Sequence, residues 1–259
     1  MDHKLFITNR SGKRIAVLLD VPKEQSGLAF VMHGLGGFKE QPQVEAFAKG
    51  FLDAKCIVVR FDCRNTLGES EGKFEDARLT NYYEDLEDVI SWARQQSWFI
   101  SPFFLCGHSL GGIAVAWYAE KNPKEVCGLA PLGTVVSGQL TMEAHGKEEI
   151  AKWKETGWFE ERSNSKPGVL KRRPWAMMDD LLRYDLRTDA AKLTMPVLFV
   201  VGDLDQSTPY VHQKLLFDLV SGRKEIHVLK GAKHTIRDEK HLQELTEILK
   251  KWLFSVKKG

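Results

Sequence analysis

Short apolar runs alternate with helical patterns along most of the chain. Continuous apolar runs predict strands at residues 28–32, 56–61, 103–106, 126–129 and 197–201, and an alternating pattern predicts another at 225–229. Strands that are apolar on both faces are typical of a parallel sheet covered by helices on each side. The pattern therefore predicts an α/β fold.

Between the predicted strands, apolar residues recur at helical spacing and predict helices, most clearly at residues 83–93 and 242–252. The order strand, helix, strand predicts right-handed crossovers and a doubly wound sheet. Near the start, predicted strands at residues 4–8 and 15–21 flank the polar run Arg10-Ser11-Gly12-Lys13. This arrangement indicates a hairpin at the edge of the sheet.

The stretch from residue 135 to residue 192 has no clear strand pattern. A connection of this length is rarely structureless, so we interpret it as a helical insertion that caps the carboxyl edge of the sheet. The predicted division is a core of residues 1–134 and 193–259 and a cap of residues 135–192. The basic run Lys171-Arg172-Arg173 in the cap is expected to be a solvated face. The alternative is that it attracts an anionic group.

Composition narrows the function classes. The chain has 259 residues, of which 43% are hydrophobic and 28% charged, as in soluble globular proteins. A net charge of +2 gives no argument for a nucleic-acid partner. We expect no signal peptide and no membrane span. The four cysteines form no Cys-x-x-Cys pair, which indicates free thiols in the cytoplasm, and no His or Cys spacing suits a metal.

The run Gly107-His108-Ser109-Leu110-Gly111 follows a predicted strand and opens a predicted helix. Such a strand-to-helix turn exposes a strained serine at a helix N-terminus, where developing negative charge is favoured. We therefore predict Ser109 as a nucleophile, against the alternative of a plain Gly/Ser turn. His108 is expected to pack beside the turn without a chemical role.

A nucleophilic serine needs a histidine base and an acid that orients it. Of the histidines after Ser109, only His234 follows a late strand in a loop, so it is the predicted base. Asp203 and Asp205 both follow the strand at 197–201. Asp205 is the favoured acid, and Asp203 is expected to form a turn with its own backbone.

A glycine-rich run, His33-Gly34-Leu35-Gly36-Gly37, follows the strand at 28–32. Such a loop lets backbone N–H groups approach a substrate carbonyl, so the N–H groups of Leu35 and Leu110 are the expected oxyanion-hole donors. The alternative is a glycine turn that only ends the strand. His33 is expected to support the loop by hydrogen bonding.

Together these motifs resemble the α/β-hydrolase family over nearly the whole chain. The chain is similar to bacterial carboxylesterases, including cinnamoyl (feruloyl) esterases, and to serine aminopeptidase-like and monoacylglycerol lipase-like hydrolases. Residues 62–72 also resemble the family's loop after the following strand, where most relatives have a glycine in place of Asn65 or Thr66. The resemblance implies a mostly parallel eight-stranded sheet with helices on both faces and a helical cap.

We predict a serine carboxylesterase that hydrolyses small to medium esters, needs no cofactor or metal, and is a monomer or homodimer. The alternatives are a feruloyl esterase, an acyl-CoA thioesterase, an aminopeptidase and, outside the enzymes, a binding protein on the same scaffold. Aromatic residues of the cap are the candidates for lining the substrate pocket. They are Trp153, Trp158, Phe159 and Trp175.

Overall fold

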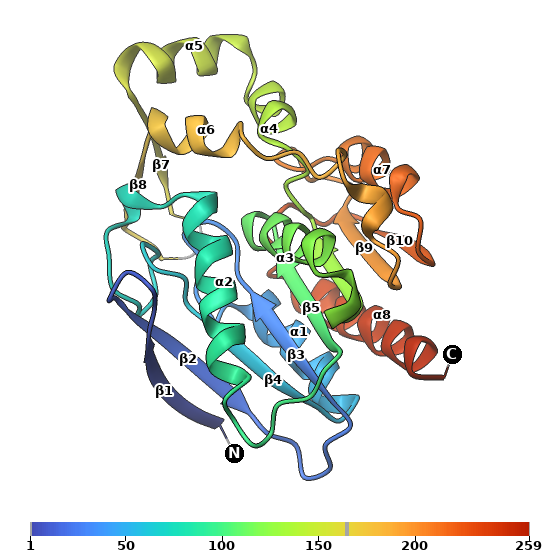
Figure 1. Ribbon diagram of the computed structural model, residues 1–259. Coiled ribbons are helices and arrows are strands. Elements are labelled where there is room, and N and C mark those ends of the chain that lie inside the picture. The colour runs from blue at the N-terminus through green and yellow to red at the C-terminus, as the bar shows by residue number, and fades with distance from the viewer. Residues whose placement is uncertain (1, 164–165, 259) are drawn as a thin grey trace.

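An eight-stranded sheet runs through the centre of the protein in the order β1-β2-β4-β3-β5-β6-β9-β10 (Figure 1). The structure is a computed structural model, and it describes residues 2–163 and 166–258. The strands of this sheet are β1 (Asp2–Thr8), β2 (Arg14–Asp20), β3 (Gly27–Met32), β4 (Cys56–Phe61), β5 (Phe103–His108), β6 (Val126–Leu132), β9 (Val197–Gly202) and β10 (Lys224–Leu229).

Strand direction separates an edge hairpin from a parallel core. Strand β1 pairs with β2, and β2 with β4, in antiparallel register, whereas all pairs from β4 to β10 are parallel. Every residue of β3, β4, β5 and β9 is buried, which is why these strands are continuously apolar in sequence. The predicted parallel sheet and its edge hairpin are confirmed.

Helices cover both faces of the sheet. The helices α2 (Leu79–Ala93) and α3 (Leu110–Lys121) pack on one face, together with α7 (Tyr210–Leu219), and α1 (Pro42–Asp53) and α8 (Glu239–Lys258) pack on the other (Figure 1). The described residues also form the 3₁₀ turns η1 (Phe74–Asp76), η2 (Pro123–Glu125) and η3 (Ala190–Lys192). The fold is that of the α/β hydrolases, as the motifs predict.

The loop after β4 contains a residue in a left-handed conformation. Asn65 has a φ of 60°, and asparagine is one of the few residues other than glycine that adopt this region readily. Its side-chain amide donates to the carbonyl of Asp76 and to Oδ1 of Asn81, each at 3.1 Å. Asn65 thus occupies a left-handed backbone conformation that glycine also adopts readily.

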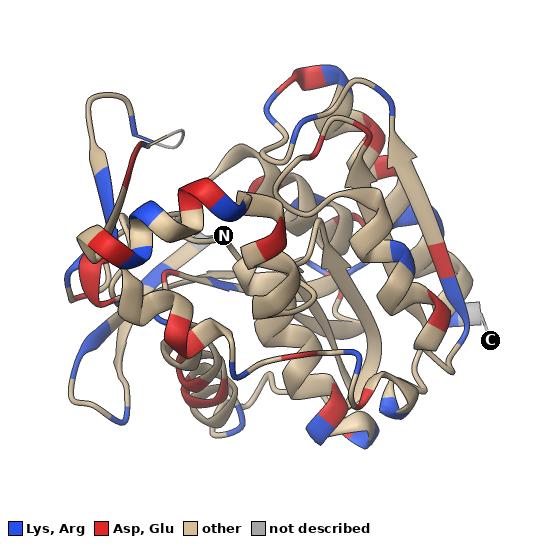
Figure 2. Ribbon diagram, turned by 90° about the horizontal axis from the view of Figure 1, so that it is seen from above, with Lys and Arg blue, Asp and Glu red and all other residues tan. Residues whose placement is uncertain are grey.

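The β6–β9 segment (residues 133–196) lies over the carboxyl ends of the parallel strands (Figure 1). It contains α4 (Gly138–His145), α5 (Lys147–Thr156) and α6 (Trp175–Leu181). It also contains two antiparallel strands, β7 (Trp158–Arg162) and β8 (Leu170–Pro174), so the prediction of a segment without strands is wrong. Glu160 and Glu161 of β7 stand opposite the basic run of β8 (Figure 2). Pairing of oppositely charged residues across the strands supports a hairpin with few apolar residues.

Within residues 2–163 and 166–258, no helix has the length and apolar content that a bilayer span requires. The same residues include no group of three or more His, Cys, Asp or Glu side chains arranged to hold a metal ion.

Candidate active site

Ser109 stands at the sharp turn between β5 and α3, with a φ of 56° and a ψ of −116°. A positive φ strains a residue with a side chain. The surroundings leave room only for glycine two positions before and two positions after Ser109. A Cβ on Gly107 would lie 2.4 Å from the carbonyl oxygen of Gly111, and one on Gly111 would lie 2.4 Å from that of His33. The two glycines therefore permit the turn that presents Ser109 at the N-terminus of α3.

Ser109, His234 and Asp205 form a connected series of hydrogen bonds. The Ser109 Oγ lies 2.9 Å from His234 Nε2, and His234 Nδ1 lies 2.8 Å from Asp205 Oδ2. Since a carboxylate only accepts, Nδ1–H donates to Asp205 and Nε2 is left to accept the serine proton. The structure thus brings together three residues that are 125 and 29 positions apart in sequence.

Asp205 is buried but well supplied with donors. Its Oδ1 accepts the backbone N–H groups of Ser207 at 2.9 Å and Thr208 at 2.8 Å, and its Oδ2 accepts the Thr208 hydroxyl at 2.8 Å. Burial favours the neutral carboxyl, yet the hydrogen bonds and charge of His234 and the donors of Thr208 outweigh it and lower the pKa of Asp205. The carboxylate therefore stays ionised beside the imidazole.

Asp203 differs from its predicted role. Its Oδ1 accepts the backbone N–H of Gly231 at 2.6 Å, so it joins the loop after β9 to the loop that carries His234. The prediction that Asp203 hydrogen-bonds its own backbone is therefore wrong. Thr208 is a residue that the sequence reasoning missed. It lies three residues after Asp205, and both its backbone N–H and its hydroxyl donate to the Asp205 carboxylate.

His108 packs against His234, with ring centroids 4.8 Å apart. Burial, followed by the neighbouring His234, lowers the pKa of His108 to about 3, so its ring is neutral. His33 is also neutral, since burial lowers its pKa. Its Nδ1–H donates to the carbonyl of Gly34 at 2.7 Å and its Nε2 accepts the N–H of Cys63 at 3.0 Å, which joins the loops after β3 and β4.

The glycine-rich loop after β3 approaches Ser109 closely. A Cβ on Gly34 would lie 3.0 Å from the Cβ of Ser109, so a side chain there would crowd the serine. Leu35 and Leu110, whose N–H groups are the expected oxyanion-hole donors, both line the cavity in front of Ser109. That their N–H groups act as oxyanion-hole donors stays a prediction from the sequence.

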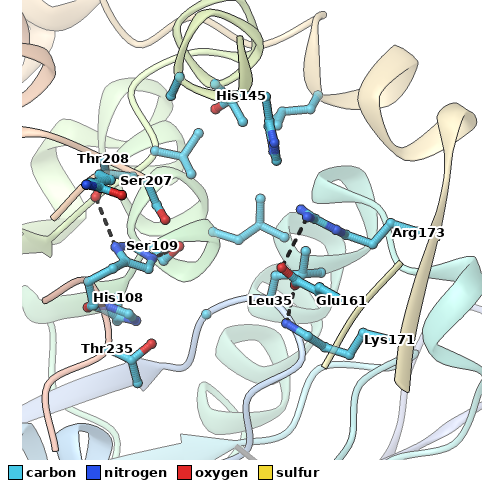
Figure 3. A pocket seen from close by; sticks show the side chains of 18 of the residues that line it. Leu35, His108, Ser109, His145, Glu161, Lys171, Arg173, Ser207, Thr208 and Thr235 are labelled. Atoms are coloured by element: carbon cyan, nitrogen blue, oxygen red, sulfur yellow. Dashed lines mark hydrogen bonds and ion pairs between the residues drawn. The ribbon is translucent and has the colours of Figure 1, made fainter. Parts of the chain in front are cut away.

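A cavity of about 310 Å³ opens in front of Ser109, between the sheet and the β6–β9 segment. This volume is at the lower end of the range of small-molecule sites. On the Ser109 side it is lined by His108, Thr208, His234 and Thr235, and across the cavity by His145, Glu161, Lys171 and Arg173 (Figure 3). The apolar lining comes from Leu35, Leu110, Val135, Met177 and Leu181.

The four predicted pocket aromatics lie elsewhere in the β6–β9 segment. Trp153 is 1% exposed and packs against Phe159 and Trp175, with ring centroids 5.2 and 5.7 Å away. Trp158 is exposed on the outer face of the hairpin, beneath the guanidinium of Arg172. These rings form the segment's own core and outer surface, and the cavity lining is made by other residues.

The basic run also departs from its predicted position. Arg172 is exposed, as expected of a solvated face, but Lys171 and Arg173 are 9% and 8% exposed and line the cavity. The reason is strand geometry, because alternate residues of β8 point to opposite faces of the hairpin. Recognising residues 170–174 as a strand would have placed Lys171 and Arg173 on one face.

Comparisons with known proteins agree with this fold. The family model described as serine aminopeptidase, S33, matches residues 23–179, a range that includes Ser109 and ends before Asp205. An uncharacterised 31.7 kDa protein of Escherichia coli, from the traX-finO intergenic region, is 27% identical over 266 residues, covering 90% of each chain. The 3-oxoadipate enol-lactonase 1 of Acinetobacter baylyi is 24% identical over 232 residues, covering 80% of this chain and 81% of its own length.

Solved structures show the same architecture. Est1E of Butyrivibrio proteoclasticus, with ferulic acid bound, aligns with a TM-score of 0.82 at 21% identity, over 98% of this chain and 100% of its own. The mouse α/β hydrolase domain-containing protein 10 aligns with a TM-score of 0.81 at 17% identity, over 98% and 99% of the two chains. The sequence match extends over more than half of the chain, and the fold agrees with it. The protein therefore belongs to the serine aminopeptidase, S33, family and is an α/β hydrolase.

Proposed function

We propose that this protein is a serine carboxylesterase that hydrolyses small to medium carboxylic esters through an acyl-enzyme on Ser109. The observation that carries the proposal is the hydrogen-bonded series from Ser109 Oγ through His234 to Asp205, with distances of 2.9 and 2.8 Å. Each of the three groups has the partner that its chemical role requires. The cavity in front of Ser109 gives the substrate a place to bind.

In the proposed reaction, His234 Nε2 takes the proton of Ser109 as Oγ attacks the ester carbonyl. The backbone N–H groups of Leu35 and Leu110 stabilise the oxyanion, and Asp205 stabilises the imidazolium. His234 then protonates the leaving alcohol. A water molecule, deprotonated by the same histidine, attacks the acyl-enzyme and releases the acid.

Residues 135–192, which make up most of the β6–β9 segment, are the proposed cap on a core of residues 1–134 and 193–259. Residues of this cap line one side of the cavity. We therefore propose that the cap determines which acyl and alcohol groups the enzyme accepts. A feruloyl esterase, a thioesterase and an aminopeptidase use the same nucleophile and differ in the groups that the cavity accepts. The cytoplasmic location and the monomeric or homodimeric state stay predictions from the sequence.

The test is Ser109→Ala, assayed with p-nitrophenyl acetate and butyrate. We expect kcat to fall by about 10⁴- to 10⁶-fold, and labelling by a fluorophosphonate probe to disappear. Ser91→Ala, at an exposed position of α2, is the matched control and should retain both. Unchanged turnover in Ser109→Ala would refute the proposal, and absent labelling of the native protein would favour a binding protein.

The substrate class is tested with a panel that adds methyl ferulate, an acyl-CoA and an aminoacyl anilide. Highest kcat/KM for p-nitrophenyl esters would support the carboxylesterase. A higher value for the ferulate ester, the thioester or the anilide would replace it with the corresponding alternative.

A further inference from the structure

The hairpin β7–β8 turns one of its faces toward the cavity. Burial alternates along both strands, with Phe159, Glu161, Lys171 and Arg173 on the inner face. Two cations and one carboxylate thus share a partly apolar face. Their side chains extend from the hairpin into the cavity, on the side opposite Ser109 (Figure 3).

Glu161 lies between the two cations. Its Oε1 is 2.5 Å from Lys171 Nζ, and its Oε2 is 3.4 Å from the nearer Arg173 nitrogen. The contact with Lys171 is a close ion pair, whereas the contact with Arg173 is longer than a good hydrogen bond. One carboxylate cannot neutralise two cations, so the cluster retains a charge of about +1 at the cavity wall.

Arg173 is the less satisfied of the two cations. It is 8% exposed, and among the described residues its Nε has no hydrogen-bond partner. Its guanidinium lies over the rings of Phe159 and Trp153, 4.3 and 5.2 Å from their centroids. Burial lowers the pKa of Arg173, although Glu161 and Glu149 raise it. A buried guanidinium with a free donor is costly unless an anion completes its hydrogen bonds.

The other charged neighbours do not fill the free donor of Arg173. Glu149 of α5 hydrogen-bonds Nδ1 of His145, at the end of α4, and favours the charged form of Arg173 without hydrogen-bonding to it. Glu160 lies on the outer face of β7 and pairs with Arg172 at 2.7 Å. The described charges around the inner face therefore leave Arg173 as the group with unused donor capacity.

We propose that the cavity binds esters that carry a carboxylate at the end remote from the scissile bond, and that Arg173 and Lys171 hold this carboxylate. The inference rests on the proposed ester hydrolysis, for which it names the substrate class. A guanidinium matches a carboxylate in geometry, and a single carboxylate matches the single excess charge. A dianionic phosphate fits less well than a carboxylate, because Glu161 repels two negative charges more strongly than one.

The test compares mono-p-nitrophenyl adipate and suberate with the corresponding ω-amides, which have nearly the same shape without the charge. We expect kcat/KM to be about 10- to 100-fold higher for the carboxylates, as for a charge-assisted hydrogen bond. In Arg173→Gln and Lys171→Gln the ratio of kcat/KM for the carboxylate ester to kcat/KM for its ω-amide should fall at least tenfold. Arg173→Lys keeps the positive charge but lacks the planar guanidinium with its paired N–H donors, so it should retain part of the preference.

Arg172→Gln is the matched control, since it removes the same charge from the outer face of the same strand. It should keep the native preference, and circular dichroism should show all variants folded. Equal kcat/KM for carboxylate and amide esters in the native protein would overturn the inference. The inference would also be overturned if Arg172→Gln abolished the preference for carboxylates while Arg173→Gln and Lys171→Gln left it intact.

Calorimetry with Ser109→Ala separates this inference from the proposed function. Monomethyl adipate should bind at least tenfold more tightly than the methyl ester of adipamic acid, even if no ester tested is hydrolysed. Equal affinities would overturn the anion site whatever the catalytic result. Inorganic phosphate that binds more tightly than monomethyl adipate would overturn the assignment to a carboxylate.

Discussion

The imidazole Nε2 of His108 lies 2.9 Å from the backbone carbonyl oxygen of His234, to which its N–H donates. This hydrogen bond connects the last residue of β5 with the loop that follows β10, two segments that are 126 positions apart in sequence. Because His108 precedes Ser109 directly, the same contact fixes the distance between the candidate nucleophile and its candidate base. His108 is thus a positioning residue.

His108→Ala should lower kcat for p-nitrophenyl butyrate by about 10- to 100-fold, since small misplacements of reacting groups are costly. KM should change by less than about threefold, because His108 is only 4% exposed and offers little surface to a substrate. Since the His108 ring is neutral, with a pKa of about 3, the shape of the pH–rate profile between pH 5 and 9 should be unchanged. A native kcat in the folded variant would contradict this role.

Asp205→Asn should lower kcat by about 10⁴-fold, because an amide can hold His234 in the wrong tautomer and cannot stabilise the imidazolium. Asp203→Asn is the matched control, two residues earlier on the same loop. Its amide oxygen can still accept the N–H of Gly231, so activity should stay within about twofold of native. Steady-state kinetics on p-nitrophenyl acetate decide between the two aspartates, and equal losses would refute the assignment.

Local pattern was enough to predict the sheet and the positions of the candidate residues around Ser109. The strands β3, β5 and β9 are uniformly buried, so their composition alone marks them. The strand-to-helix turn at Ser109 and the loop at Leu35 follow such strands immediately, and their glycines are required by close contacts. Parallel strands align their carboxyl ends, so residues that follow them meet at one edge.

The β6–β9 segment was harder to predict because its strands are short and rich in charge. Glu160 and Glu161 pair with Arg172 and Lys171 across the hairpin, and this pairing is visible only once the two strands are brought together. A run of three basic residues resembles a solvated helix face when it is considered alone. The four aromatics were assigned to the pocket by residue type. In the structure Trp153, Phe159 and Trp175 instead form the core of the segment, and Trp158 is exposed.

Glu120 of α3 should make stability depend on pH. Burial, and then the negative charge of Asp189, raises the pKa of Glu120 to about 9. In the unfolded chain this carboxyl loses its proton near pH 4.5, so between about pH 4.5 and 9 the folded state binds more protons. The free energy of unfolding therefore falls as pH rises through this range.

Glu120→Gln replaces the buried acid with a neutral group of similar shape. It should be more stable than native by on the order of 2 kcal/mol near pH 7, with the gain shrinking toward pH 5. Urea unfolding at pH 5, 7 and 8.5 measures the difference. Glu244→Gln, at an exposed position of α8, should show no such trend, and a gain for Glu120→Gln that is constant with pH would refute the explanation.

Lys39 is the buried cation that braces the loops after β3 and β4. Its side chain is fully buried, and its Nζ lies 3.0 Å from Asp62 Oδ2, 2.6 Å from Glu69 and 2.8 Å from Glu40. Asp62 is equally buried, and it also accepts the backbone N–H groups of Lys39 and Glu69 at 2.7 and 2.8 Å. Removing the cation leaves the carboxylate of Asp62 buried without its counter-ion.

Lys39→Met should therefore lower the free energy of unfolding by about 3–5 kcal/mol, as measured for broken buried ion pairs. The double variant Lys39→Met/Asp62→Asn should recover part of this loss, because no unpaired charge then remains. Lys4→Met removes an exposed contact to the same Glu69 and should cost less than about 1 kcal/mol. Urea unfolding of the three variants gives the comparison. If Lys39→Met cost no more than Lys4→Met, the buried pair would not be what holds these loops together.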